Sequence, residues 1–257
     1  GNAVDAAIAT GFALGVLEAN ANGIGGGGFM IIKMVDMAEP VVIDFREKAP
    51  GKATPTMYLG PDGKVIPNST IEGGLSVGVP GEVKGLLYAL ENYGSGKLSR
   101  ADIIQPAIQW ALQGIPVTVN LESIIKDNYG KLVKYENGAQ IYLKDGLPYE
   151  VGDVIYNPDL ARTLAKIVKE GADAIYKGPI AQAMVDEVQK RGGILTLEDL
   201  ANYEIKVRKA VEGEYRGYKV YSVPPASSGG THLIEILNIL ENFDVVKLGF
   251  QTAQASH

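Results

Sequence analysis

A continuous apolar run that ends in charged residues predicts the centre of the fold: Val41-Val42-Ile43-Asp44-Phe45-Arg46-Glu47. A second apolar run, Phe29-Met30-Ile31-Ile32, precedes it, and a polar connection joins the two. Strands that are apolar along their whole length belong to sheets covered on both faces. The sequence therefore predicts two buried strands, with Arg46 placed at the end of the second.

Helical patterns surround these strands. From Asn2, the expected cap, to about Leu17, small apolar residues recur at helical spacing. Further segments carry the signals of a helix start, namely Pro80-Gly81, Ser99, Asn157-Pro158, Pro179 and Thr196. An apolar helix, Leu233 to Leu240, is predicted after Ser228-Gly229-Gly230.

The middle of the chain, Tyr129 to Pro158, is polar and rich in turn residues. Turns are expected at Asn137-Gly138 and at Asp145-Gly146, because Gly after Asn or Asp favours a turn. We therefore predict an irregular excursion over this stretch.

A strand pair is predicted near the end of the chain. Its strands are Tyr203 to Arg208 and Tyr215 to Tyr221, with the turn at Glu212-Gly213, and Pro224-Pro225 ends the second strand. No repeat or shift in composition divides the chain, so one mixed α/β domain over residues 1–257 is the simplest account. Because the chain opens inside a helical pattern and ends without a stop signal, we expect a segment truncated at both ends.

Charge and composition exclude several classes of function. The 24 Lys and Arg against 30 Asp and Glu give a net charge of −6, which disfavours nucleic acid as a partner. The sequence has no cysteine, which excludes disulfides, thiolate nucleophiles and Cys-bound metals. Its two histidines, His232 and His257, are too few for a multi-histidine metal centre. The longest apolar stretch, Ala6 to Leu17, is too short for a membrane span.

Gly23, Gly25 and Gly28 match the spacing of a dinucleotide-binding turn, G-x-G-x-x-G. That turn follows a strand and opens a helix. Here the glycines follow a helix and precede a strand, so phosphate binding is disfavoured. Glycines at such a turn let two backbone segments approach closely, or they leave room for a ligand beside the strand that follows.

His232 is a candidate general base because Ser227 and Ser228 lie close to it in the sequence. It also lies two residues after Gly230, in the first turn of an apolar helix. A capping or packing role is commoner at such a position. We therefore favour a structural role for His232.

Arg46 is the most informative candidate for ligand binding. Ligands favour strand ends of this kind, and a guanidinium holds a carboxylate through two parallel hydrogen bonds. Arg46 is thus suited to grip an anionic substrate. An internal ion pair with Asp44 or Glu47 explains its presence equally well.

Blocks of sequence spread over nearly the whole chain follow one ordered pattern. They are Gly1-Asn2-Ala3-Val4-Asp5-Ala6-Ala7, Gly25-Gly26-Gly27-Gly28-Phe29-Met30, Ile43-Asp44-Phe45-Arg46-Glu47, Val79-Pro80-Gly81, Gln105-Pro106-Ala107, Tyr215-Arg216-Gly217-Tyr218 and Pro224-Pro225-Ala226-Ser227-Ser228-Gly229-Gly230. With these blocks the chain resembles the large subunit of the gamma-glutamyltransferases (gamma-glutamyltranspeptidases), which are N-terminal nucleophile hydrolases.

The resemblance implies an α+β fold, the four-layer αββα sandwich of the N-terminal nucleophile hydrolases, here incomplete because only the large-subunit part is present. Such a precursor cuts itself into a large and a small subunit, and the new N-terminal Thr of the small subunit attacks the gamma-glutamyl amide. The acyl group then passes to water or to an amino acid. The chemistry implied needs no metal and no cofactor. No catalytic residue is expected in this chain, which we expect to be inactive alone.

The resemblance also assigns roles to two residues of this chain. Arg46 aligns with the arginine that binds the alpha-carboxylate of the donor, and Glu47 is expected to orient Arg46 or a nearby amine. Thr231 is not expected to be the nucleophile, because its block matches a non-catalytic region. The expected partners are the small subunit, a gamma-glutamyl donor such as glutathione, and a water or amino-acid acceptor. Bacterial members are commonly periplasmic or secreted, which suggests the same location.

Two alternative functions stay open. A cephalosporin- or glutaryl-type acylase on the same scaffold would also use Arg46, since its substrate offers a carboxylate too. A non-catalytic binding protein that has lost the nucleophile is the other alternative. A Thr at a processing junction downstream would favour an enzyme, and its absence would favour a binding protein.

Overall fold

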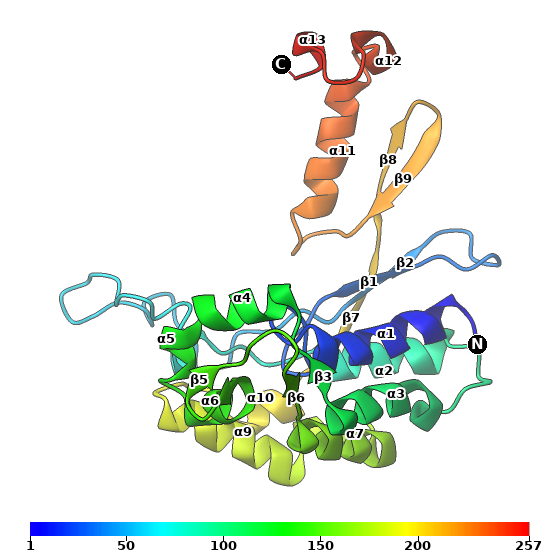
Figure 1. The fold of residues 1–257 in the computed structure, drawn as a ribbon. Coiled ribbons are helices and arrows are strands. Elements are labelled where there is room, and N and C mark those ends of the chain that lie inside the picture. The colour runs from blue at the N-terminus through cyan, green and yellow to red at the C-terminus, as the bar shows by residue number, and fades with distance from the viewer. Residues whose placement is uncertain (257) are drawn as a thin grey trace. The chain divides into compact units, whose positions relative to one another are not determined.

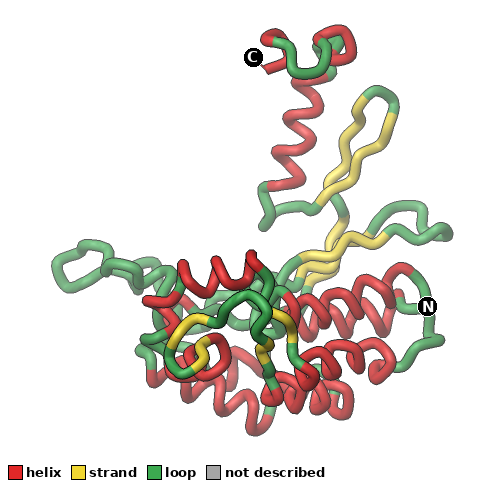
Figure 2. The backbone as a smooth tube through the Cα atoms, viewed as in Figure 1, coloured by secondary structure: helices red, strands yellow, loops and turns green. Residues whose placement is uncertain are grey.

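The computed structural model describes residues 1–256 and contains both helices and strands (Figure 1, Figure 2). The mixed α and β content predicted from the sequence is confirmed. The chain divides into two compact units: unit 1 comprises Gly1–Gly27 and Arg46–Glu204, and unit 2 comprises Gly28–Phe45 and the chain from Ile205 onward. The sequence predicts one domain over residues 1–257. The division into two compact units does not test that prediction, which stays a prediction. Within residues 1–256, no helix has the length and apolar character needed to cross a membrane.

Unit 1 is built mainly from helices. They are α1 (Ala3–Leu17), α2 (Glu82–Tyr93), α3 (Arg100–Gln113), α4 (Val119–Asp127), α5 (Tyr129–Leu132), α6 (Glu136–Tyr142), α7 (Pro158–Glu170), α8 (Asp173–Tyr176), α9 (Gly178–Lys190) and α10 (Leu197–Ala201), with the 3-10 turn η1 (Gly74–Ser76). Two short antiparallel pairs join β3 (Ile115–Pro116) to β6 (Val154–Ile155) and β4 (Leu143–Lys144) to β5 (Leu147–Pro148). Helix α1 packs against α2 and α3, and α3 packs against α7.

Local capping explains where several of these helices begin. Asn2 Oδ1 accepts the N–H of Asp5 at 3.0 Å, and Asp5 Oδ2 accepts the N–H of Asn2 at 2.8 Å, which satisfies two helix-end donors at once. Ser99 and Thr196 make the same reciprocal arrangement at α3 and α10. Asn157 caps α7 through its side chain. The helix starts predicted at these positions are confirmed.

The predicted irregular excursion is more regular than expected, because it contains α5, α6 and the β4–β5 hairpin. Asp145 and Gly146 form the hairpin turn as predicted, with φ of 53° and 81°. The turn predicted at Asn137-Gly138 is wrong, since both residues lie in the first turn of α6. In the first turn of a helix the backbone N–H groups have no partner within the helix. Residues of weak helix propensity, such as Asn and Gly, therefore reduce helix stability little at these positions.

Unit 2 contains two antiparallel sheets and three helices within the described residues. Its elements are β1 (Phe29–Ile32), β2 (Val41–Asp44), β7 (Lys206–Lys209), β8 (Val211–Tyr215), β9 (Tyr218–Ser222), α11 (Gly229–Leu240), α12 (Val245–Leu248) and α13 (Ala253–Ser256). The predicted strands β1 and β2 are confirmed, and β2 is central, with Ile43 opposite Met30 and Val207. Val42 and Ile43 are buried but Ile31 is 43% exposed, so the predicted cover on both faces holds for β2 and not for β1.

The strand pair predicted near the end of the chain is wrong in its pairing. Strand β7 pairs with β2, and β8 pairs with β9, with Tyr215 opposite Tyr218. The chain turns at Arg216-Gly217, where φ is 51° and 80°, and the predicted turn at Glu212-Gly213 lies inside β8.

Glycines in unit 2 mark the close approach of α11 to the β8–β9 hairpin. A Cβ atom at Gly213 would lie 2.8 Å from Cγ2 of Ile234 on α11, and one at Gly230 would overlap the carbonyl oxygen of Val223. Gly213 is therefore required by helix packing within a strand, which explains why it is a poor turn signal.

Candidate functional site

Arg46 forms an ion pair with its neighbour Glu47. Its Nε lies 3.2 Å from Oε2 of Glu47, and the two side chains are 59% and 35% exposed. Asp44 is the other acid expected as an ion-pair partner of Arg46. Its Oδ2 accepts a hydrogen bond of 2.7 Å from Nε of Arg208. The ion pair with Glu47 does not prevent Arg46 from binding a substrate carboxylate. A guanidinium has five hydrogen-bond donors, and the Arg46 side chain is accessible to solvent.

Tyr203 fixes the main chain at Arg46. The buried Tyr203 hydroxyl donates a hydrogen bond of 2.9 Å to the carbonyl oxygen of Arg46. Its ring stacks on that of Tyr176, with centroids 5.7 Å apart, and the Tyr176 hydroxyl donates to the carbonyl oxygen of Pro80 at 2.8 Å. Two buried aromatic rings thus connect the segment that carries Arg46 to the residues that precede α2.

The glycine-rich turn after α1 docks on the first residues of α2. The carbonyl oxygen of Gly26 accepts the N–H groups of Gly81 and Glu82 at 2.8 and 3.0 Å, and the Gly26 N–H donates to Gly23 at 2.9 Å. A Cβ atom at Gly26 would lie 3.3 Å from the Gly23 carbonyl oxygen. The close approach of backbone segments therefore occurs at Gly26. A Cβ atom at Gly23 or Gly25 would meet nothing within 4 Å, so these two glycines leave open space instead.

This turn borders a hollow of about 390 Å³, called the acidic hollow below, which is lined by residues 19–23 and 25–27 together with Glu47 and Glu82. Two carboxyl groups and no lysine or arginine line it, which speaks against phosphate as its ligand. Asn22 Oδ1 is buried there and has no hydrogen-bond partner within residues 1–256. The two carboxyl groups therefore make the acidic hollow suited to a ligand that brings donors or positive charge.

Glu82 is the buried acid of this hollow, with 8% exposure at the first position of α2. Burial raises the pKa of Glu82, and the negative charge of Glu47 raises it further, to about 7. The sequence did not single out Glu82, because a Glu in the first turn of a helix is usually solvated. Its burial depends on the docking of the distant glycine turn, and no local pattern carries that information.

A second hollow, of about 510 Å³, adjoins the first, since Gly25 and Glu47 line both. Arg46 and Lys48 bring positive charge to its wall. A cationic wall thus lies beside an anionic one. That arrangement is complementary to an amino-acid group, which carries a carboxylate and an ammonium side by side.

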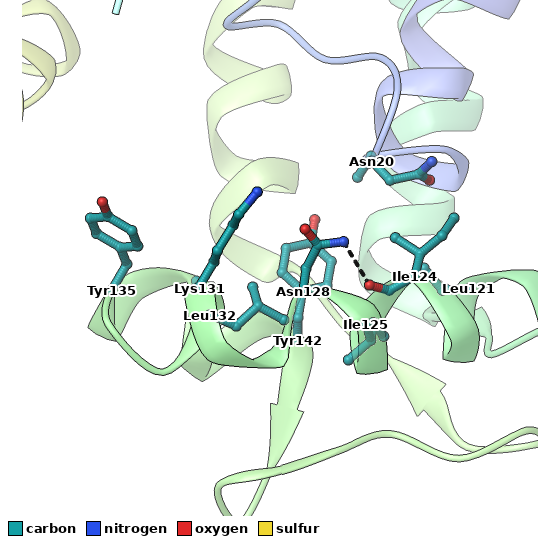
Figure 3. Close-up of a pocket in the computed structure, with 11 residues that line it drawn as sticks. Asn20, Leu121, Ile124, Ile125, Asn128, Lys131, Leu132, Tyr135 and Tyr142 are labelled. Carbon is teal, nitrogen blue, oxygen red and sulfur yellow. Dashed lines mark hydrogen bonds between the residues drawn. The ribbon is translucent and has the colours of Figure 1, made fainter. Parts of the chain in front are cut away.

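An apolar pocket of about 440 Å³ lies between α4, α5 and α6, in the stretch predicted to be irregular (Figure 3). Figure 3 shows Leu121, Ile124 and Leu132 along the pocket, with Lys131 extending beside it. It shares Ala19 and Asn20 with the acidic hollow. Sequence reasoning missed this pocket because the short helices that form it were not predicted.

The other candidate residues from the sequence, His232 and Thr231, do not line any of these hollows. His232 is exposed in the first turn of α11, where its N–H donates to the carbonyl oxygen of Ser228 at 3.0 Å. Thr231 precedes it in the same turn, and His257 lies outside the described residues. Among residues 1–256, no group of three or more His, Cys, Asp or Glu is arranged to hold a metal ion.

Comparison with known proteins identifies the family. The family model described as gamma-glutamyltranspeptidase matches residues 1–257. The chain belongs to the gamma-glutamyltranspeptidase family. It is 45% identical to the "Glutathione hydrolase proenzyme" of Escherichia coli (strain K12) over 99% of this chain. The gamma-glutamyltranspeptidase of Helicobacter pylori superposes with a TM-score of 0.96 at 43% identity, covering 100% of this chain and 73% of that one.

A relative of a different name is nearly as similar. The "Acylase ACY 1 proenzyme" of Pseudomonas sp. (strain SE83) is 40% identical over 100% of this chain. The chain spans 44% of the E. coli protein and 47% of the acylase, which is less than half the length of either relative. The matches therefore concern one part of a longer relative.

Proposed function

We propose that this chain is the large-subunit part of an enzyme that transfers or hydrolyses gamma-glutamyl groups. The nucleophile is an N-terminal Thr of a small subunit from the same precursor. Its hydroxyl attacks the gamma-carbonyl, the amine leaves with a proton, and water or an amino acid then takes the acyl group. The assembled protein has the four-layer αββα sandwich, and this chain by itself is inactive because it lacks the nucleophile. The relatives named as proenzymes support a precursor of this kind.

One observation carries the proposal: an accessible Arg46 guanidinium stands beside an acidic hollow. Glu47 pairs with that guanidinium, and the Tyr203 hydroxyl holds the main chain of Arg46. A gamma-glutamyl donor such as glutathione presents an alpha-carboxylate and an alpha-ammonium. Arg46 takes the carboxylate through paired hydrogen bonds. Glu47 orients the guanidinium and adds negative charge for the ammonium.

An acylase acting on a cephalosporin or glutaryl amide is the second candidate, and the acylase relative at 40% identity favours it. Its substrate has the carboxylate but lacks the alpha-ammonium. Comparing a gamma-glutamyl amide with the matching glutaryl amide therefore separates the two functions. A higher kcat/KM for the gamma-glutamyl amide supports transfer or hydrolysis of gamma-glutamyl groups, and the reverse order supports the acylase.

The direct test replaces Arg46 in the complete precursor. Arg46→Lys keeps the charge and removes the paired geometry, so kcat/KM for a gamma-glutamyl donor should fall about 10- to 150-fold, mainly through KM. Self-cleavage, which uses no donor, should continue and is read as two bands on a denaturing gel.

Arg191→Lys is the matched control, because Arg191 also forms an ion pair with a nearby glutamate. Its Nε lies 2.9 Å from Oε1 of Glu187, which is on α9. It should leave kcat/KM unchanged. An Arg46→Lys enzyme with full kcat/KM would show that Arg46 does not bind the donor. Loss of processing would show that Arg46 serves the structure instead.

A further inference from the structure

Glu82 and Glu47 reach the acidic hollow from two separate segments. Glu82 begins α2 and is 8% exposed, whereas Glu47 directly follows Arg46. The main chain of Glu82 is fixed, because its N–H donates to the carbonyl oxygen of Gly26 at 3.0 Å. Both carboxyl groups line the same hollow. The negative charge of Glu47 therefore acts on the Glu82 carboxyl group.

The titratable groups around Glu82 come from each segment packed on it. Burial raises the pKa of Glu82, and the negative charge of Glu47 raises it further, to about 7. Tyr176 on α8 stays protonated, because burial raises its pKa. Lys84, on α2 itself, lies over the Tyr176 ring at 5.1 Å from its centroid. Residues 19–27 carry no ionisable side chain. Glu82 is thus a group that changes charge near neutral pH with Glu47 as its main electrostatic neighbour.

We propose that Glu82 is a positioning residue for the donor carboxylate and acts through the Glu47–Arg46 ion pair. This inference rests on the function proposed for Arg46. With Glu82 neutral, Glu47 carries the negative charge of the hollow and holds the guanidinium at 3.2 Å. When Glu82 ionises, a second negative charge appears in the hollow that Glu47 also lines. It repels both Glu47 and the incoming carboxylate, and the donor binds more weakly.

The size of the effect follows from the repulsion between like charges near a protein surface, which weakens binding by about three- to tenfold. The direction is fixed by the charge states. Binding of a carboxylate-bearing donor should be tight below neutral pH and weaker above it. A donor without the carboxylate does not feel this repulsion, so the ratio of the two affinities should fall as the pH rises.

The test uses the complete, processed protein and two competitive inhibitors. One is a stable gamma-glutamyl analogue, and the other is the same analogue without its alpha-carboxylate. The ratio of their inhibition constants isolates the contribution of the carboxylate, and titration of the nucleophile affects both alike. The ratio is measured from about pH 5.5 to about pH 8.5. In the wild type, preference for the carboxylate should fall about three- to tenfold across this range.

Glu82→Gln mimics the neutral acid, so its preference should stay at the low-pH value throughout. Glu82→Asp keeps a titrating carboxyl group and should retain the fall, with its midpoint displaced. It also serves as the second variant where Glu82→Gln fails to mature. Glu91→Gln is the matched control, the same change on the same helix at a side chain 62% exposed, and it should behave as the wild type.

The outcomes separate this inference from the function on which it rests. A Glu82→Gln protein whose preference falls with pH as in the wild type overturns the inference, as does a Glu82→Asp protein with a flat profile. A purely structural role would lower kcat or thermal stability and leave the slope of the profile unchanged. If the wild type shows no preference for the carboxylate at any pH, the proposed function of Arg46 is what fails.

Discussion

Burial of one carboxyl group, that of Glu82, links the stability of the protein to pH. An acid with a higher pKa in the folded state binds its proton more tightly when folded. The pKa of Glu82 rises from about 4.5 to about 7 on folding, with burial as the larger cause. Between these pH values the folded protein holds more protons than the unfolded one. Its free energy of unfolding therefore falls as the pH rises through this window.

We predict that Glu82→Gln removes most of this pH dependence. At pH 8 the variant should have a free energy of unfolding about 1–3 kcal/mol higher than the wild type, and at about pH 4, below both pKa values, the two should be about equal. Urea unfolding at both pH values measures the difference, with Glu91→Gln as the control. If wild type and variant lose the same stability between the two pH values, Glu82 is ionised in the folded protein at neutral pH.

The candidate site was only partly predictable from the sequence. Arg46 stood out because a lone guanidinium at the end of an apolar run is rare and local. Glu82 did not, because its burial arises from the contact of Gly26 with the start of α2, and these residues are far apart in the chain. The raised pKa depends on that contact and on Glu47, so nothing near Glu82 in the sequence could indicate it.

Helices and strands differ in how well the sequence predicts them here. Asn2 and Ser99 fix the starts of α1 and α3 through hydrogen bonds to residues three positions away, so a local pattern suffices. The β8–β9 hairpin was misplaced because Gly213 indicates a turn locally. A glycine is needed at position 213 because Ile234 on α11 packs against that position. A non-local contact outweighs the local preference.

The contact between α11 and the hairpin gives a prediction for two neighbouring glycines. Gly230→Ala should destabilise the protein by about 1–3 kcal/mol, because a Cβ there meets the carbonyl oxygen of Val223, which cannot move aside as a flexible side chain can. Gly229→Ala is the control, since its Cβ would meet only Ser227 Oγ at 3.5 Å, an ordinary contact. Midpoints of thermal unfolding compare the two. Equal midpoints would show that α11 shifts freely on the hairpin.

For the whole molecule, the apolar surface of unit 2 matters most. Leu233, Ile236, Ile239 and Phe243 are between 41% and 56% exposed on α11 and just after it. Contiguous apolar surface on a soluble protein is normally an interface. In the proposed enzyme we expect the small subunit to cover this surface.

We therefore predict that this chain self-associates when it is expressed by itself. Sedimentation velocity should show oligomers or aggregates, and co-expression with the rest of its precursor should restore a single species. A monodisperse monomer with an ordinary cooperative melt would contradict the prediction.

The glycine-rich turn has a consequence for protein engineering. It is fastened through main-chain atoms, with one carbonyl oxygen of Gly26 accepting two N–H groups at the start of α2. Asn20, which lines the acidic hollow, takes no part in that fastening, whereas Asn22 donates its N–H to Glu18 and has a buried Oδ1 atom. A library that varies Asn20 can therefore remodel the shape and polarity of the wall without loosening its support. Asn20 is the natural starting point for directed evolution of substrate range.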